Sequence, residues 1–211
     1  MKLEAWGVPY EEGGHSEERI LAASECVKSP GIPDSAPIVR KLRERGVPVI
    51  SEIEFAGRYL DGARTICITG SNGKTVIKEW IAEELPAGMK YYRSPKSYNS
   101  QLGVPLSVLM LEGDEELAIF EAGISKPGEM ERLERIIRPD VVVFTSIGDA
   151  HQENFLNLEQ KCDEKMVLAR NASKIVYHSY YEPLGGMVAA RFADRKPFDA
   201  AAFPELSLIH I

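Results

Sequence analysis

The chain has 211 residues, of which 44% are hydrophobic and 27% charged, and its formal net charge is −7 at pH 7. These values are typical of a globular protein with one large domain, or one domain and a fragment. The acidic balance argues against sequence-independent nucleic-acid binding, which needs a basic face. No apolar run is long enough to cross a membrane, and the three cysteines form neither a disulfide framework nor a metal-ligand spacing. We therefore expect a cytoplasmic protein without nucleic-acid or membrane partners.

The first part of the chain reads as a strand, a helix and a second strand. Residues 25–28 form a short strand candidate that a Ser-Pro-Gly sequence stops. Residues 36–45 have the spacing of an amphipathic helix, and Gly46 closes it. Residues 47–50 follow as the next strand, and residues 55–62 link this unit to the rest.

The most informative motif is Gly70-Ser71-Asn72-Gly73-Lys74-Thr75, which lies between an apolar strand candidate (residues 66–69) and a helical pattern. A glycine-rich turn from a strand into a helix directs backbone N–H groups and the helix N-terminus at phosphate oxygens. Lys74 would reach the β- and γ-phosphates, and the Thr75 hydroxyl would bind Mg²⁺. The motif predicts a site for ATP or GTP with Mg²⁺.

The spacing of this motif is tighter than in the general phosphate loop. That loop has a glycine five positions before the glycine that precedes the lysine, where this chain has Ile68. The nearest upstream glycine is Gly70, which gives G-x-x-G-K-T. A turn that caps a helix by chance is the alternative, and the flanking strand and helix favour nucleotide binding over it.

The helix after Thr75 is predicted to bury one apolar face in the core, rather than to form a cofactor site. We expect Pro86 to end this helix, whose apolar face comprises Val76, Ile77, Trp80, Ile81 and Leu85.

Downstream of this helix, helical and strand patterns alternate, which predicts an α/β fold with a mostly parallel sheet. The predicted helices and strands are helix 103–111, strand 117–121, helix 127–137, strand 141–145, helix 158–172 and strand 174–178.

Two further candidates fall at the carboxyl ends of predicted strands, where ligands of open α/β sheets gather. Glu121 ends one strand, and a hard cation needs only one or two such carboxylates beside phosphate oxygens. His151 lies in the glycine-containing loop after another strand, next to Asp149. We interpret Asp149 as a solvated loop acid and the other histidines as surface or packed residues.

The phosphate-loop motif and several longer segments resemble those of a known protein family. Residues 69–75 (T-G-S-N-G-K-T) match the phosphate loop of the Mur ligases, the ATP-dependent enzymes that build the peptide stem of bacterial cell-wall precursors. From about residue 75 to about residue 165 the chain resembles the D-alanyl-D-alanine-adding member, especially the form fused to an alanine racemase. The segments that carry this likeness are R-S-P-K-S-Y-N-S-Q-L-G-V-P-L-S (93–107), F-E-A-G-I-S-K-P-G-E-M (120–130) and S-I-G-D-A-H-Q-E-N-F (146–155).

The first part resembles a different member, the D-glutamate-adding ligase, through residues 27–39 and 46–56. The resemblance implies a partial, Rossmann-like domain for a uridine-nucleotide substrate at 1–58 and the central ATP-binding domain, incomplete at its end, at 59–205. We interpret the chain as a hybrid reading frame, truncated at both ends, with an adapter-derived tail at 206–211. We accordingly expect this chain alone to ligate poorly or not at all.

The resemblance also implies roles for single residues. Lys74 and the loop residues Gly70, Ser71, Asn72 and Gly73 would hold the phosphates of ATP, and Thr75 and Glu121 would hold Mg²⁺. His151 falls on the second-metal histidine and Asn99 on the asparagine near the γ-phosphate. Lys161 falls near the lysine that the family carbamoylates, with Lys165 as the alternative.

The reaction implied is amide formation through an acyl phosphate. Its substrates would be D-alanyl-D-alanine and UDP-N-acetylmuramoyl-tripeptide (UDP-MurNAc-tripeptide), or D-glutamate and UDP-MurNAc-L-alanine. Two other classes stay open: a non-catalytic nucleotide-binding module, and another phosphate-loop enzyme such as a folate-polyglutamate ligase or a GTPase. The chain has no N-K-x-D guanine-reading motif, and residues 93–107 fit the cell-wall enzymes better. The sequence gives no oligomeric state.

Overall fold

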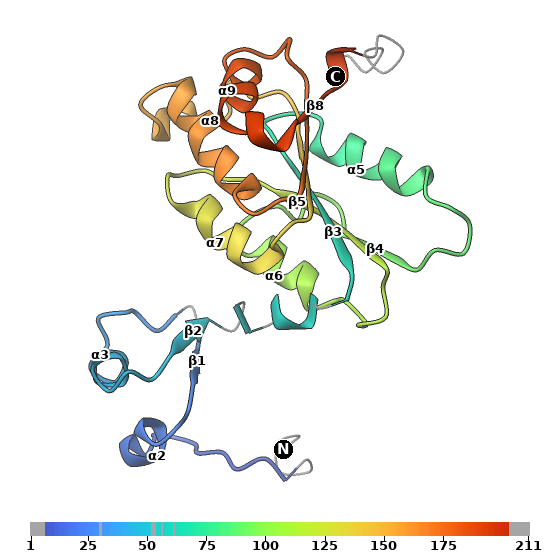
Figure 1. Ribbon diagram of the computed structural model, residues 1–211. Helices are drawn as coiled ribbons and strands as arrows, with labels where there is room; N and C mark the ends of the chain where they lie inside the picture. The colour runs from blue at the N-terminus through green and yellow to red at the C-terminus, as the bar shows by residue number, and fades with distance from the viewer. Residues whose placement is uncertain (1–6, 30, 52–53, 56, 61, 203–211) are drawn as a thin grey trace. The chain divides into compact units, whose positions relative to one another are not determined.

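The computed structural model describes residues 7–29, 31–51, 54–55, 57–60 and 62–202 (Figure 1). The chain divides into two compact units, residues 1–55 and 56–211. The predicted tail at 206–211 lies outside the described residues. None of the helices described is long and apolar enough to cross a membrane.

The first unit contains the predicted strand, helix and strand. Its two strands, β1 and β2, pair in parallel with Cys26 opposite Val49, and α3 connects them. Proline at the start of α3 has its φ angle preset for a helix, and Val39 and Leu42 bury its inner face. The helix α2, not predicted from the sequence, is capped by the Ser16 hydroxyl. The bounds are α2 (Glu17–Leu21), β1 (Cys26–Lys28), α3 (Pro37–Glu44) and β2 (Val49–Ser51).

The second unit is built on a six-stranded sheet in the order β4-β5-β3-β6-β7-β8. Every neighbouring pair of these strands is parallel, which confirms the predicted α/β class. The bounds are β3 (Arg64–Thr69), β4 (Tyr91–Arg93), β5 (Leu117–Ala122), β6 (Val141–Phe144), β7 (Lys174–Tyr177) and β8 (Phe198–Asp199).

Helices lie on both faces of this sheet, as its buried central strands require: Figure 1 shows α5 on one side and α6 and α7 on the other. The helices are α5 (Lys74–Glu83), α6 (Gly103–Val108), α7 (Glu129–Ile137), α8 (Leu158–Met166) and α9 (Leu184–Arg191). Short 3₁₀ turns, η1 to η5, occupy Gly57–Leu60, Gln152–Asn154, Val167–Ala169, Ala193–Arg195 and Ala200–Ala202.

The register of the central strands sets the position of the candidate residues. Ile68 of β3 pairs with Glu121 of β5, and Thr69 pairs with Phe144 of β6. The phosphate loop, Glu121 and the loop after β6 therefore meet at one edge of the sheet, as predicted from its carboxyl ends.

The prediction for the buried face of α5 was partly wrong. Ile77, Ile81 and Leu85 pack on the core, whereas Val76 and Trp80 are exposed. The helix instead buries Lys78 completely. The apolar pattern could not show this because a lysine is buried only when partners for its charge exist elsewhere in the fold.

Candidate nucleotide site

The phosphate loop leaves β3 in close contact with the first residues after β6. The Thr145 hydroxyl donates a hydrogen bond to the Asn72 carbonyl at 2.6 Å. A Cβ atom on Gly70 would lie 1.7 Å from the same hydroxyl oxygen, so only glycine fits there. Gly73 begins α5 with a φ of +80°, which favours glycine. Gly70 is thus required by the close approach of the Thr145 side chain, and Gly73 by its backbone angle.

A second set of bonds ties the phosphate loop to residues 146–148. The Ser71 N–H donates to the Ser146 carbonyl at 2.7 Å, and the Gly148 N–H donates to the Ser71 hydroxyl at 2.9 Å. Because His151 follows on the same loop, these bonds hold it beside the turn of residues 70–73, here called the glycine corner.

A cavity of about 180 Å³ opens at this edge of the sheet. It is smaller than a pocket that encloses a whole ligand, and it suits the phosphate end of a nucleotide. The cavity is lined by several of the predicted site residues and by Lys165, the alternative to Lys161. The full lining is Gly70, Ser71, Lys74, Asn99, Ser100, Gly123, Ile124, Ser125, Ala150, His151 and Lys165. Five residues predicted for the site do not line it: Asn72, Gly73, Thr75, Glu121 and Lys161.

Two lysines project onto the glycine corner. The Lys74 ammonium donates to the Gly70 carbonyl at 2.9 Å and to the Ser71 carbonyl at 3.1 Å. Lys165, of which 2% is exposed, donates to the Gly70 carbonyl at 3.2 Å. Lys161 lies one turn earlier on α8 and donates to the carbonyls of Gly148 and Ala150. Ala150 lines the cavity, whereas Lys161 does not. Of the two lysines considered from the sequence, Lys165 is therefore the one that faces the site.

The pKa values of these lysines are lowered. Burial lowers the pKa of Lys165 to about 7, and the positive charges of Lys74 and Lys161 act in the same direction. Burial also lowers the pKa of Lys74, against the opposing charge of Glu121. For Lys161, burial lowers the pKa and Asp149 opposes the shift. Three lysines gathered at one end of the sheet favour an anionic ligand such as a phosphate group.

Glu121 lies behind the cavity wall and is fully buried. One carboxylate oxygen accepts a hydrogen bond from the Asn99 side-chain amide at 3.3 Å, and Asn99 lines the cavity. The other oxygen lies 2.9 Å from the Lys78 ammonium. Glu121 thus contacts the cavity wall through Asn99.

The metal-ligating side chains described at this end of the sheet are too few to hold a metal ion by themselves, and they suit Mg²⁺ that is also bound by phosphate oxygens and water. Among the described residues, no group of three or more His, Cys, Asp or Glu could hold a metal ion. Mg²⁺ commonly takes one or two carboxylates with phosphate oxygens and water, which matches a lone Glu121 beside a phosphate loop. His151 lines the cavity with a φ of +60°, a strained value for a residue with a side chain.

Lys78 was not among the site residues predicted from the sequence, and Lys165 was predicted only as the alternative to Lys161. Both have a detectable signal, because Lys74 and Lys78, like Lys161 and Lys165, are spaced four residues apart and lie on one face of a helix.

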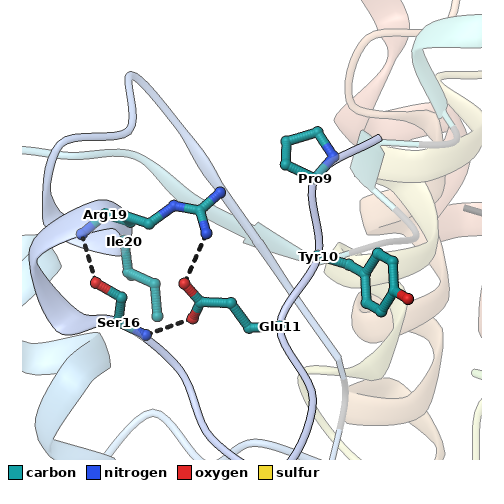
Figure 2. Close-up of a pocket in the computed structure, with 6 residues that line it drawn as sticks. All are labelled: Pro9, Tyr10, Glu11, Ser16, Arg19 and Ile20. Carbon is teal, nitrogen blue, oxygen red and sulfur yellow. Dashed lines mark hydrogen bonds and ion pairs between the residues drawn. The ribbon is translucent and has the colours of Figure 1, made fainter. Parts of the chain in front are cut away.

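The first unit has a second, open pocket of about 280 Å³, lined by Pro9, Tyr10, Glu11, Ser16, Arg19 and Ile20 (Figure 2). In Figure 2, Glu11, Ser16 and Arg19 face one another. Arg19 donates to the Glu11 carboxylate at 2.7 Å, and the Ser16 N–H also donates to it. These bonds lower the pKa of Glu11, the backbone bond most. Because the charge of Arg19 is paired with that of Glu11, this pocket is less suited to bind a phosphate group than the cavity at the phosphate loop.

Comparisons with known proteins agree with this geometry. The family model described as the Mur ligase middle domain matches residues 68–184. The UDP-N-acetylmuramoylalanine–D-glutamate ligase of Bacteroides fragilis is 66% identical over 154 residues, 72% of this chain and 32% of that protein. The UDP-N-acetylmuramoyl-tripeptide–D-alanyl-D-alanine ligase of Borreliella burgdorferi is 37% identical over 142 residues, 67% of this chain and 30% of that protein.

Solved structures show the same fold. The MurF ligase of Thermotoga maritima in complex with ADP has a TM-score of 0.60 at 22% identity, over 87% of this chain and 48% of that one. The chain spans about a third of the length of the curated relatives it matches. With more than half of its residues matched by the family model, the chain belongs to the Mur ligase family.

Proposed function

We propose that this chain carries the ATP site of a ligase that forms an amide bond in peptidoglycan precursor synthesis. The observation that carries the proposal is one cavity at the carboxyl edge of a parallel sheet, lined by Gly70, Lys74, Asn99 and His151. A cytoplasmic location, expected from the sequence, stays a prediction.

The chemistry follows from these parts. A substrate carboxylate oxygen attacks the γ-phosphorus of ATP, the bond to ADP breaks, and an acyl phosphate forms. The amine of the second substrate attacks the acyl carbon and loses a proton, the bond between the acyl carbon and the phosphate oxygen breaks, inorganic phosphate leaves, and an amide remains. Lys74 and the loop N–H groups would hold the phosphates in line, which is most of the catalysis in such a transfer. Glu121 and the Thr75 hydroxyl would hold Mg²⁺, with His151 near a second ion; bound Mg²⁺ neutralises phosphate charge.

For the amine substrate we propose D-alanyl-D-alanine, added to UDP-MurNAc-tripeptide. The support is that the segments resembling this member, 93–107, 120–130 and 146–155, supply Asn99, Ser100, Gly123 and His151 to the cavity wall. D-glutamate, added to UDP-MurNAc-L-alanine, is the second candidate, supported by the 66% identity to the Bacteroides fragilis protein.

We test this function by incubating an excess of the 211-residue chain with labelled ATP for long times, so that slow ligation is detected. The expected result is slow amide formation between D-alanyl-D-alanine and UDP-MurNAc-tripeptide, detected by mass spectrometry. Product with only the D-glutamate pair would replace the first candidate by the second. ATP binding without product from either pair would agree with the expectation that this chain alone does not ligate. The absence of ATP binding would contradict the proposed ATP site.

We further propose Lys165, in preference to Lys161, as the lysine that is carbamoylated. The reaction needs a neutral amine, which attacks CO₂ and loses a proton, and burial of Lys165 favours that neutral form. With ¹³C-bicarbonate, we expect a carbamate carbon signal that Lys165→Met abolishes and Lys161→Met retains. The reverse pattern would restore Lys161 as the modified residue.

A further inference from the structure

A fully buried lysine on α5 connects the phosphate-loop helix to two other parts of the site. The Lys78 ammonium lies 2.9 Å from a carboxylate oxygen of Glu121, and neither side chain has any exposed surface. A buried charge is tolerated only with close partners, so this pair is fixed in its geometry.

The same ammonium binds the loop after β4. It donates to the Ser94 carbonyl at 2.7 Å and to the Lys96 carbonyl. Lys96 has a φ of +50°, a left-handed conformation that a residue with a side chain adopts at a cost. The loop leads directly to Asn99, whose amide donates to the second oxygen of Glu121.

The contacts form a closed arrangement with Lys78 at its centre. Glu121 is held on one oxygen by Lys78 and on the other by Asn99, and Lys78 also holds the loop that carries Asn99. Lys78 does not line the cavity and cannot touch a nucleotide there.

From this geometry we propose that Lys78 is a positioning residue of the site: it fixes the Glu121 carboxylate and the 94–99 loop relative to the phosphate loop. The proposal rests on the function proposed above as far as Mg²⁺ is concerned. The effect of Lys78 on the 94–99 loop does not depend on a bound nucleotide.

The first test is hydrogen exchange of the protein without ligands, in wild type, Lys78→Met and Lys78→Arg. Lys90→Met is the matched control, because Lys90 is an exposed lysine that pairs with Asp114 in the same unit. We expect amide exchange in residues 94–99 to speed up about tenfold or more in Lys78→Met, to stay near wild type in the control, and to be partly restored in Lys78→Arg. Unchanged exchange in this loop, or a uniform increase over the whole unit, would overturn the proposal.

The second test uses Mn²⁺ as a probe of the metal site in the presence of ADP. Loss of a residue that orients a metal ligand weakens metal binding by about 10- to 100-fold, so we expect that loss in Lys78→Met with metal-free ADP affinity unchanged. Equal Mn²⁺ affinity in the variant and wild type would contradict the proposal. Wild-type protein that binds neither ADP nor Mn²⁺ would instead contradict the proposed function, and the exchange test would still decide the role of Lys78.

Lys78→Met leaves Glu121 buried without its cation, and this variant could fail to fold. The double variant Lys78→Met/Glu121→Gln removes both charges and avoids that problem. We expect it to fold and still to exchange faster in residues 94–99, because the two carbonyls remain without their donor. A folded double variant with wild-type exchange there would overturn the proposal.

Discussion

Replacing Lys74 with methionine is expected to weaken ATP binding by about 10- to 100-fold, the value of a hydrogen bond to a charged group. Single-turnover transfer should fall further, by about 10³-fold, because the ammonium acts on charge that develops in the transition state. The fold should persist, since burial lowers the pKa of Lys74 and its charge is a cost to folding. Calorimetric titration with ATP and the single-turnover assay measure the two effects.

The control for this prediction is Lys174→Met, an exposed lysine at the opposite end of its strand from the site. It should bind ATP as wild type does. If Lys74→Met and Lys174→Met bound ATP equally well, the glycine corner would not be the phosphate site.

Replacing Lys165 with methionine is expected to change how stability depends on pH. The folded pKa of about 7 lies below the ordinary value of 10.5, so the unfolded chain binds more protons between these limits. The free energy of unfolding of wild type should then rise with pH across this window, by up to about 1.4 kcal/mol per pH unit from this group. The variant should lack this contribution and be the more stable protein near neutral pH.

Urea unfolding at several pH values, in buffer free of bicarbonate so that the amine stays unmodified, measures this difference. The pKa values of Lys74 and Lys161 are also lowered, so both residues contribute to the pH dependence of wild type. The comparison with Lys165→Met measures the effect of removing Lys165, including its effect on these two charges. Parallel pH profiles for the two proteins would show that Lys165 is not held in a neutral form.

Much of the fold follows from local patterns. The bounds of the strands β3, β5 and β6 and of the helix α7 were predicted within a few residues. Continuous apolar runs and helical spacing are local patterns that can be recognised in the sequence alone. The short strands β4 and β8 were missed. They have three and two residues, and they pair only because a sheet edge is present to receive them.

The positions of the candidate residues follow from the sequence better than the charge balance around them does. The glycine corner and the strand-end position of Glu121 follow from the motif and from the topology of parallel sheets. The pairing of Glu121 with Lys78, and the choice of Lys165 over Lys161, depend on which helix face meets the loop. The spacing of residues in the sequence narrows the candidates to a few side chains on one helix face. Which of them faces the site is decided by tertiary packing.

The most direct measurement is a crystal structure of the chain with Mg²⁺ and a non-hydrolysable ATP analogue. The account predicts that the β- and γ-phosphates lie in the cavity within hydrogen-bond distance of the loop N–H groups. The Lys74 ammonium should leave the carbonyls of Gly70 and Ser71, its partners without ligand, and bind phosphate oxygens. A bound nucleotide with its phosphates elsewhere, and Lys74 still on those carbonyls, would contradict the account.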